Sequence, residues 1–151
     1  MTGKYDNATA SSIKGFKKIL AVSVGSATDL HGQDPTAAAM KAVSNAYESC
    51  SVPGILEIPG GVKNAKIKIK VAVPNPKGVD KERIAKAFPY GKVEVKIVGG
   101  GLRWHSGIVA PKLGDPSPNE KIEAESSDDE DAKITSNDEL IVAVAAVRIG
   151  Y

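Results

Sequence analysis

The sequence has one cysteine, few aromatic residues and no long apolar run. Because Cys50 is the only cysteine among 151 residues, an intramolecular disulfide is excluded and a reducing compartment is favoured. No apolar run approaches the length that spans a bilayer, and residues 1–18 lack the apolar middle of a secretory signal. We therefore expect a cytoplasmic protein without a membrane partner.

The formal net charge of +2 hides a strong asymmetry along the chain. Residues 115–138 contain 9 of the 18 acidic residues but only 2 of the 20 lysines and arginines, so the rest of the chain carries a net charge of +9. Proline, serine and asparagine accompany these acids, a composition typical of flexible segments. The sequence predicts a disordered start at 1–15 and one domain over 16–151, with a flexible acidic insertion at about 114–138.

Hydrophobic periodicity places four strands and two helices. Residues 66–73 alternate strictly between lysine and apolar side chains, apart from Ala72, which indicates a strand with one buried face. Asp34 followed by Pro35 is a favourable helix start, and Asp80 caps a second, shorter helix. The predicted strands are 18–25, 65–73, 92–98 and 139–149, and the first helix is 35–49.

This order, β-α-β-α-β-β, predicts an α/β (α+β) fold with a four-stranded mixed sheet. Right-handed crossovers put both helices on one face of that sheet. The last strand, 139–149, is nevertheless apolar on both faces, so its uncovered face needs a partner. A symmetric oligomer is the simplest way to cover it.

The candidate catalytic pair is Asp29 and His31, at the junction between a strand and a helix. A carboxylate beside an imidazole fixes its tautomer and raises its basicity, which suits a general acid or base near neutral pH. Ser26 and Thr28 are candidate substrate-binding residues that could add hydrogen bonds. The alternative is structural: Asp29 caps the local turn, and His31 donates to a backbone carbonyl.

A second candidate segment follows the third predicted strand. Gly100 and Gly101 could bring backbone amides close to a substrate, and Arg103 could hold an anionic group. His105 is a further substrate-binding candidate, and Ser106 is a candidate catalytic nucleophile if a base lies beside it. A serine–glycine pair is, however, also common in ordinary turns.

We weighed a metal site and a nucleic-acid site as well. Asp29, His31 and His105 could bind a metal, but the sequence offers no fourth ligand or histidine-pair motif, so we predict neither metal nor organic cofactor. The strand lysines have no interleaved aromatic residues, which disfavours nucleic acid. They form either a solvated face or a cleft that attracts an anionic metabolite.

Several blocks of sequence resemble one family. Asp29-Leu-His-Gly-Gln-Asp-Pro-Thr36, Val71-Ala-Val-Pro74, Phe88-Pro-Tyr-Gly-Lys-Val93 and Ala145-Ala-Val-Arg-Ile-Gly-Tyr151 occur in order. They are similar to an uncharacterised family of small proteins marked by a Gly-x-Gly-x-Asp-x-His-Gly motif. The resemblance covers 19–151 apart from the acidic insertion. Ala27 departs from it, because it stands at the second glycine of the motif.

A looser similarity is architectural. The element order is similar to the chorismate-mutase-like fold, whose members are commonly trimers with clefts between subunits, and to single units of ring-opening amidohydrolases such as cyanuric acid hydrolase. This similarity implies a homo-oligomer, with a trimer favoured.

Together these patterns favour a small-molecule enzyme that uses acid–base chemistry on an anionic metabolite in a cleft between subunits. Lyase, isomerase, cyclase and hydrolase reactions remain open. The first alternative is an oligomeric ligand-binding or regulatory module without turnover, and the second is a metal-dependent hydrolase.

Overall fold

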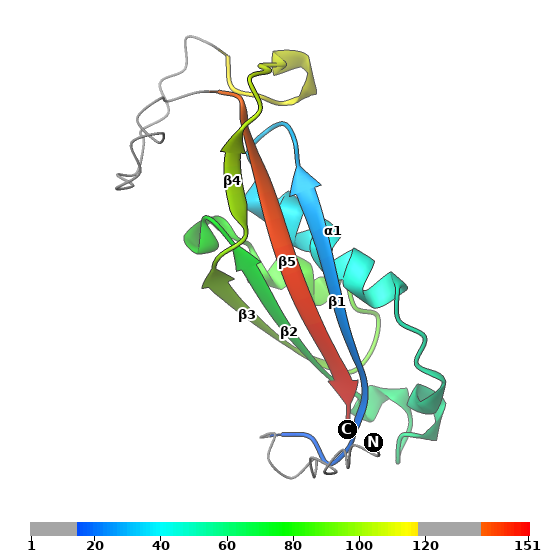
Figure 1. Ribbon diagram of the computed structural model, residues 1–151. Coiled ribbons are helices and arrows are strands. Elements are labelled where there is room, and N and C mark those ends of the chain that lie inside the picture. Colours follow the sequence, from blue (N-terminus) through cyan, green and yellow to red (C-terminus); the bar gives the residue numbers. More distant parts are fainter. Residues whose placement is uncertain (1–14, 118–136) are drawn as a thin grey trace, which may run out of the picture.

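The computed structural model describes residues 15–117 and 137–151 as a mixed sheet with two helices on one face (Figure 1). Strands β1 (Ile19–Asp29), β5 (Glu139–Gly150), β2 (Lys66–Val73) and β3 (Lys92–Gly99) follow one another across the sheet. A fifth strand, β4 (Leu102–His105), also pairs with β5. The predicted class and element order are confirmed, with one strand added.

Both helices start at the capping residues that the sequence indicates. Helix α1 (Pro35–Glu48) begins where the Asp34 carboxylate accepts from Thr36 N at 2.8 Å. Helix α2 (Lys81–Lys86) begins where Asp80 accepts from the backbone nitrogens of Glu82 and Arg83. Short 3-10 turns occupy Pro53–Glu57, Val62–Asn64, Pro76–Gly78 and Pro111–Leu113. No helix in the described ranges is long and apolar enough to cross a membrane.

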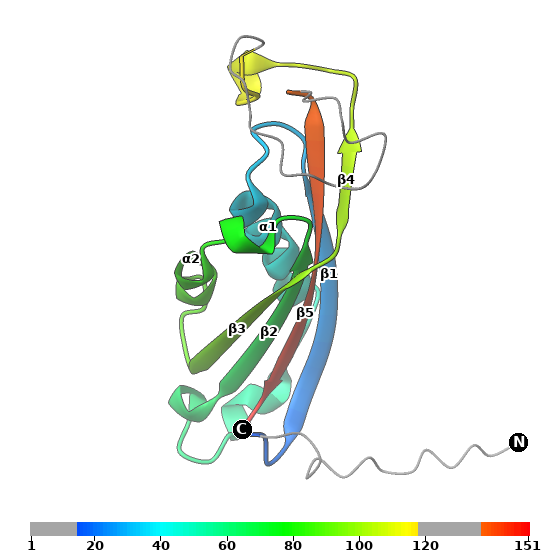
Figure 2. The same cartoon turned by 90° about the vertical axis from the view of Figure 1, so that its left-hand side faces the viewer.

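The core lies between the helices and one face of the sheet (Figure 2). The apolar set of β2 is buried there, together with alternate residues of β5 and with Ala38, Ala39, Ala42 and Ala46 of α1. Helix α1 packs directly onto β1 at Gly25, where a β-carbon would lie 2.3 Å from Ala46 N. A side chain at this position would push α1 away from the sheet.

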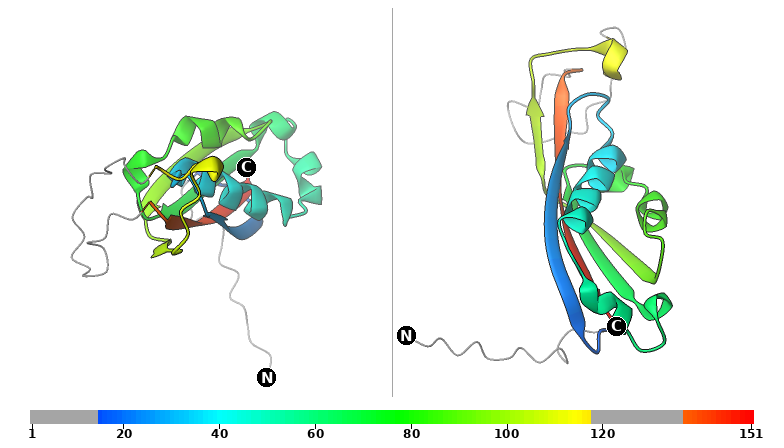
Figure 3. Two further views of the ribbon diagram at one scale, coloured as in Figure 1. Left: turned by 90° about the horizontal axis from the view of Figure 1, so that it is seen from above. Right: turned by 90° about the vertical axis from the view of Figure 1, so that its right-hand side faces the viewer.

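The opposite face of the sheet is uncovered by helices (Figures 2 and 3). Side chains of residues paired directly across strands share a face, so the pairings of β1, β4 and β5 define it. Its part on β1, β4 and β5 is mostly apolar but also includes Ser26, Thr28 and Arg148, and its part on β2 and β3 carries lysines. We call the apolar part the open-face patch; its exposed members are Val22, Val24, Leu102, Trp104 and Val144.

Strand β4 was not predicted, because its four residues show no buried alternation and follow three glycines. Those glycines carry the chain from β3 across the end of β2 onto β5. Gly100 N donates to Val73 O at 3.2 Å, and a β-carbon on Gly101 would lie 2.2 Å from Val142 O. The same crossing places β4 beside the first half of β5, while β2 pairs with the second half. The four-stranded sheet is therefore corrected to five.

Candidate functional site

Asp29, His31, Arg103, His105 and Ser106 lie at the end of the sheet where β1 and β4 end and β5 begins (Figure 1). Ile141 of β5 pairs with Asp29 on one side and with Arg103 on the other, so these three side chains share the helix-covered face. His105 pairs with Glu139, two residues further along, and His31 follows Asp29 by two residues. One chain thus brings both histidines to the same sheet end.

The hydrogen-bond partners of the Asp29 carboxylate are groups other than His31. Its carboxylate accepts from Asp34 N at 3.0 Å, and Lys41 Nζ lies 3.4 Å from its other oxygen. Asp29 itself is only 6% exposed. These contacts close the turn between β1 and α1, which is the structural alternative for this residue. The expected Asp29–His31 pairing is therefore corrected: a residue at the end of a strand is turned inward here, toward the helix.

The carboxylate partner of His31 is Asp115, 84 residues away. His31 Nδ1 lies 2.8 Å from Asp115 Oδ2, and Gly32 N donates to Asp115 Oδ1 at 3.0 Å. Ala110 N donates to the same carboxylate at 2.7 Å. The Asp115 side chain is fully buried, whereas that of His31 is 24% exposed. Asp115 falls in the predicted acidic insertion, where no local signal separates it from its acidic neighbours.

These contacts determine the charge and tautomer of the pair. Burial raises the pKa of Asp115, but hydrogen bonds from Ala110 N, His31 and Gly32 N outweigh it, so that the pKa lies below its usual value of 3.8. An ionised carboxylate only accepts hydrogen bonds, so Nδ1 of His31 must donate. In the neutral ring, Nε2 is then the unprotonated nitrogen, which can take up a proton.

His105 is paired in a similar way. Its Nδ1 lies 3.3 Å from Asp138 Oδ1, and Gly107 N donates to Asp138 Oδ2 at 2.7 Å. The Ser106 hydroxyl lies 2.8 Å from the Asp138 carbonyl oxygen and 3.1 Å from Ile108 N. Its hydrogen bonds therefore stabilise this turn, and the structure does not bring Ser106 to a base.

The remaining candidates have structural surroundings. Ser26 and Thr28 pair with Val144 and Val142, so their side chains lie on the open face, opposite to Asp29. The Arg103 side chain forms an ion pair with Glu139, with Nε 3.5 Å from Oε2, and remains 42% exposed. Gly100 and Gly101 lie close to β2 and β5, where a side chain would not fit. This close packing explains the two glycines without a ligand.

The metal alternative has no support in the geometry. Among residues 15–117 and 137–151, no three histidine, cysteine, aspartate or glutamate side chains come together in a way that could hold an ion. Asp29 lies against Lys41, and the two histidines have separate carboxylate partners.

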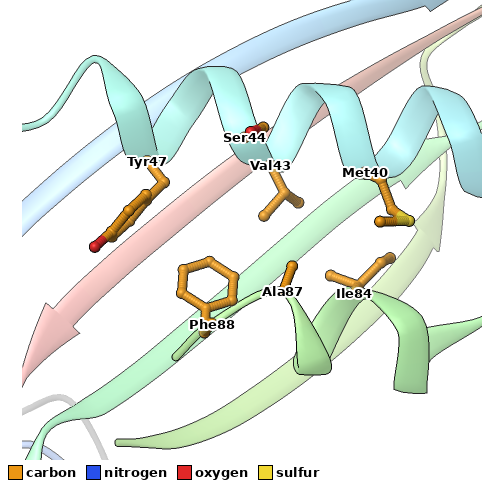
Figure 4. A pocket seen from close by; sticks show the side chains of 7 residues that line it. All are labelled: Met40, Val43, Ser44, Tyr47, Ile84, Ala87 and Phe88. Atoms are coloured by element: carbon orange, nitrogen blue, oxygen red, sulfur yellow. The ribbon is translucent and has the colours of Figure 1, made fainter. Parts of the chain in front are cut away.

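A groove between α1 and α2, away from the sheet end, has a volume of about 100 Å³ (Figure 4). The rings of Tyr47 and Phe88 form an edge-to-face pair there, with centroids 5.3 Å apart and an interplanar angle of 80°. The Tyr47 and Tyr90 hydroxyls are 2.7 Å apart, and burial together with this hydrogen bond raises the pKa of Tyr90 to about 12. The lining residues are Met40, Val43, Ser44, Tyr47, Ile84, Ala87 and Phe88. This lining is mostly apolar and offers no group that titrates near neutral pH.

The fold and the sheet-end site define a small α+β protein with paired histidines and carboxylates at one end of a mixed sheet. Residues 19–124 match the family described as conserved hypothetical protein (Lin0512_fam), and the chain belongs to this family. It is similar to a crystal structure from Nostoc punctiforme PCC 73102, a FtsZ-like protein of unknown function, with 30% identity and a TM-score of 0.66. That match covers 87% of this chain and 93% of the other. No curated protein matches the chain.

Proposed function

We propose that this protein is a small-molecule enzyme in which His31 acts as general acid and base, positioned by Asp115. The observation that carries the proposal is the 2.8 Å contact between His31 Nδ1 and a fully buried carboxylate. Two backbone N–H groups hold that carboxylate in place, so the ring orientation is fixed before a substrate binds. Such pairs move protons in lyases, isomerases, cyclases and hydrolases alike.

His31 combines two properties that this chemistry requires. Its side chain is 24% exposed, so a substrate can reach the ring, while Asp115 is closed to water. Asp115 keeps Nδ1 as the donor, so Nε2 is the ring nitrogen that can exchange a proton with a substrate. His105 with Asp138, at the same sheet end, is available as a second proton-transfer group, and Arg103 supplies a partly exposed positive charge for an anionic substrate.

We propose further that the protein acts as a homo-oligomer in the cytoplasm, and the sequence-based preference for a trimer stays a prediction. The open-face patch supports an oligomer, because an exposed sheet face of aliphatic side chains with a tryptophan is unfavourable in water. The same face of a second copy of the protein, which has the same twist, could pack against this patch.

The test is conversion of metabolites. Purified protein incubated with a protein-free extract of small molecules should consume one component and form another, followed by mass spectrometry. His31→Asn should abolish that conversion while circular dichroism and thermal unfolding remain close to wild type. Tyr47→Phe, in the groove between the helices, is the matched control and should retain conversion.

A ligand-binding module without turnover is the second candidate. It is favoured by Ser106, whose hydroxyl is used in backbone hydrogen bonds and not as a nucleophile. If components of the extract bind at His31 but none is converted, this candidate replaces the enzyme.

A further inference from the structure

We infer that the side-chain amide of Gln33 is the group that binds an oxygen atom of the ligand, and that this ligand carries a carboxylate. The inference rests on the proposed site at His31 and adds a recognition residue to it. Gln33 lies in the turn between β1 and α1, two residues after His31.

Two unfavourable features coincide at Gln33. Within the described part of the chain, it is the only non-glycine residue with a positive φ, at 52°. Its Nε2 is also the only buried side-chain nitrogen or oxygen there that lacks a hydrogen-bond partner. Each feature costs free energy of folding, and neither is relieved by a neighbouring group. Costs of this kind persist where a site needs a particular geometry.

Hydrogen bonds on both sides of Gln33 fix its backbone conformation. On one side of it Gly32 N is bonded to Asp115, and on the other Asp34 N is bonded to Asp29. Both carboxylates are buried, and Asp115 also orients His31. The positive φ of Gln33 therefore lies between two fixed hydrogen bonds, one of which belongs to the carboxylate of the His31–Asp115 pair.

The unpartnered amide predicts the chemistry of the ligand. Nε2 carries two N–H donors, so its partner must be an acceptor oxygen. Gln33 as a whole stays partly exposed, so rotation of its side chain can bring the amide to the surface. Because Nε2 has no protein partner, that rotation breaks no hydrogen bond of Nε2. Binding of the ligand therefore adds one hydrogen bond and removes none. An anionic oxygen, as in a carboxylate, accepts a stronger hydrogen bond from an N–H group than a neutral oxygen does. Lys41 and Arg103, ion-paired with Asp29 and Glu139, both remain more than 40% exposed.

Acetate is the probe that tests this inference. In ¹⁵N-labelled protein, the Gln33 side-chain resonances, assigned by their loss in Gln33→Ala, should shift saturably with sodium acetate and not with sodium chloride at equal ionic strength. Gln33→Ala should weaken acetate binding about 3- to 10-fold, the range expected for one hydrogen bond. Absence of a saturable shift at Gln33 would overturn the inference.

Gln33→Gly separates a binding role from a structural one. Glycine relieves the positive φ, so its melting temperature should rise by about 2–4 °C while acetate binding weakens as in Gln33→Ala. A lower melting temperature together with unchanged acetate binding would show that Gln33 is structural. His31→Asn distinguishes the two proposals. If His31→Asn loses conversion but still binds acetate, the proposed function and the role of Gln33 both stand. If Gln33→Ala binds acetate with wild-type affinity, the role of Gln33 is refuted and the proposed function is not.

Discussion

At the scale of single residues, the site depends on carboxylates that lie far from their histidines in the sequence. Asp115 and Asp138 each accept from a histidine Nδ1 and from the backbone nitrogen of a nearby glycine. Each carboxylate therefore positions a ring and a turn at once. Asp29, next to His31 in the sequence, closes the turn into α1 instead.

Asp115→Asn should lower the free energy of unfolding by about 1–3 kcal/mol at pH 7, because the backbone N–H groups of Gly32 and Ala110 and the His31 ring lose an anionic acceptor. The pKa of Asp115 is lowered on folding, so its ionised form stabilises the protein above pH 3.8. That contribution disappears as the pH falls through the folded-state pKa. The difference between variant and wild type should accordingly shrink in urea titrations from pH 7 to pH 3.

Glu57→Gln, at an exposed carboxylate, is the control and should stay within about 0.5 kcal/mol of wild type at each pH. A difference between Asp115→Asn and wild type that is constant over this pH range would contradict the assignment of Asp115 as the ionised partner of His31.

Ala27 shows how a single residue of the motif is accommodated. It stands at the second glycine of the motif that the sequence resembles, and a glycine there would permit a positive φ. In the structure it lies within β1 and packs against the core, without a positive φ. A β-carbon is therefore compatible with the strand at this point.

At the scale of elements, the connection between β4 and β5 determines how the sheet end is assembled. Its first residues carry Asp115 and its last carry Asp138, while 118–136 lie outside the described residues. The predicted disordered start at 1–15 also falls outside them, apart from Gly15. A deletion in this connection should therefore leave Asp115 and Asp138 in place, because each pairs with a histidine.

Replacing 118–136 by a flexible glycine–serine linker of about eight residues should change the melting temperature by less than about 4 °C. Removing 115–138 with the same linker should lower it by about 5 °C or more, because both histidines lose their partners. Differential scanning calorimetry of the two deletions makes the comparison. Equal melting temperatures would show that Asp115 and Asp138 do not stabilise the fold.

The sequence was sufficient for elements that have local signals. The alternating lysine and apolar residues of β2, and the caps at Asp34 and Asp80, predict elements that the structure contains. It was insufficient for β4, whose residues are mostly exposed, and for the His31–Asp115 contact, which joins residues 84 positions apart. A contact between residues so far apart produces no local pattern in the sequence. Local patterns therefore indicate Asp29, two residues from His31, as the partner.

At the scale of the whole molecule, the sheet has one face in the core and one face without a covering layer. The open-face patch extends over β1, β4 and β5, and the lysines of β2 and β3 continue the same face. A second copy placed on the patch would bury its valines and Trp104 while the lysine rows remain in water.

Val24→Lys combined with Trp104→Asp should convert the proposed oligomer to a monomer, since each places a charge in the buried contact. Light scattering coupled to size-exclusion chromatography measures the mass. Leu56→Asp, at an exposed leucine in Pro53–Glu57, is the control and should leave the mass unchanged. A wild-type mass of one chain, at concentrations up to about 100 µM, would refute the oligomer.

The pairing of His31 with Asp115 and of His105 with Asp138 has a consequence for engineering. Each end of the β4–β5 connection is attached to the sheet by its own histidine–carboxylate contact. A peptide tag or a fluorescent domain inserted between residues 117 and 137 would therefore lie close to the sheet end. Such an insertion offers a way to report on ligand binding at the proposed site.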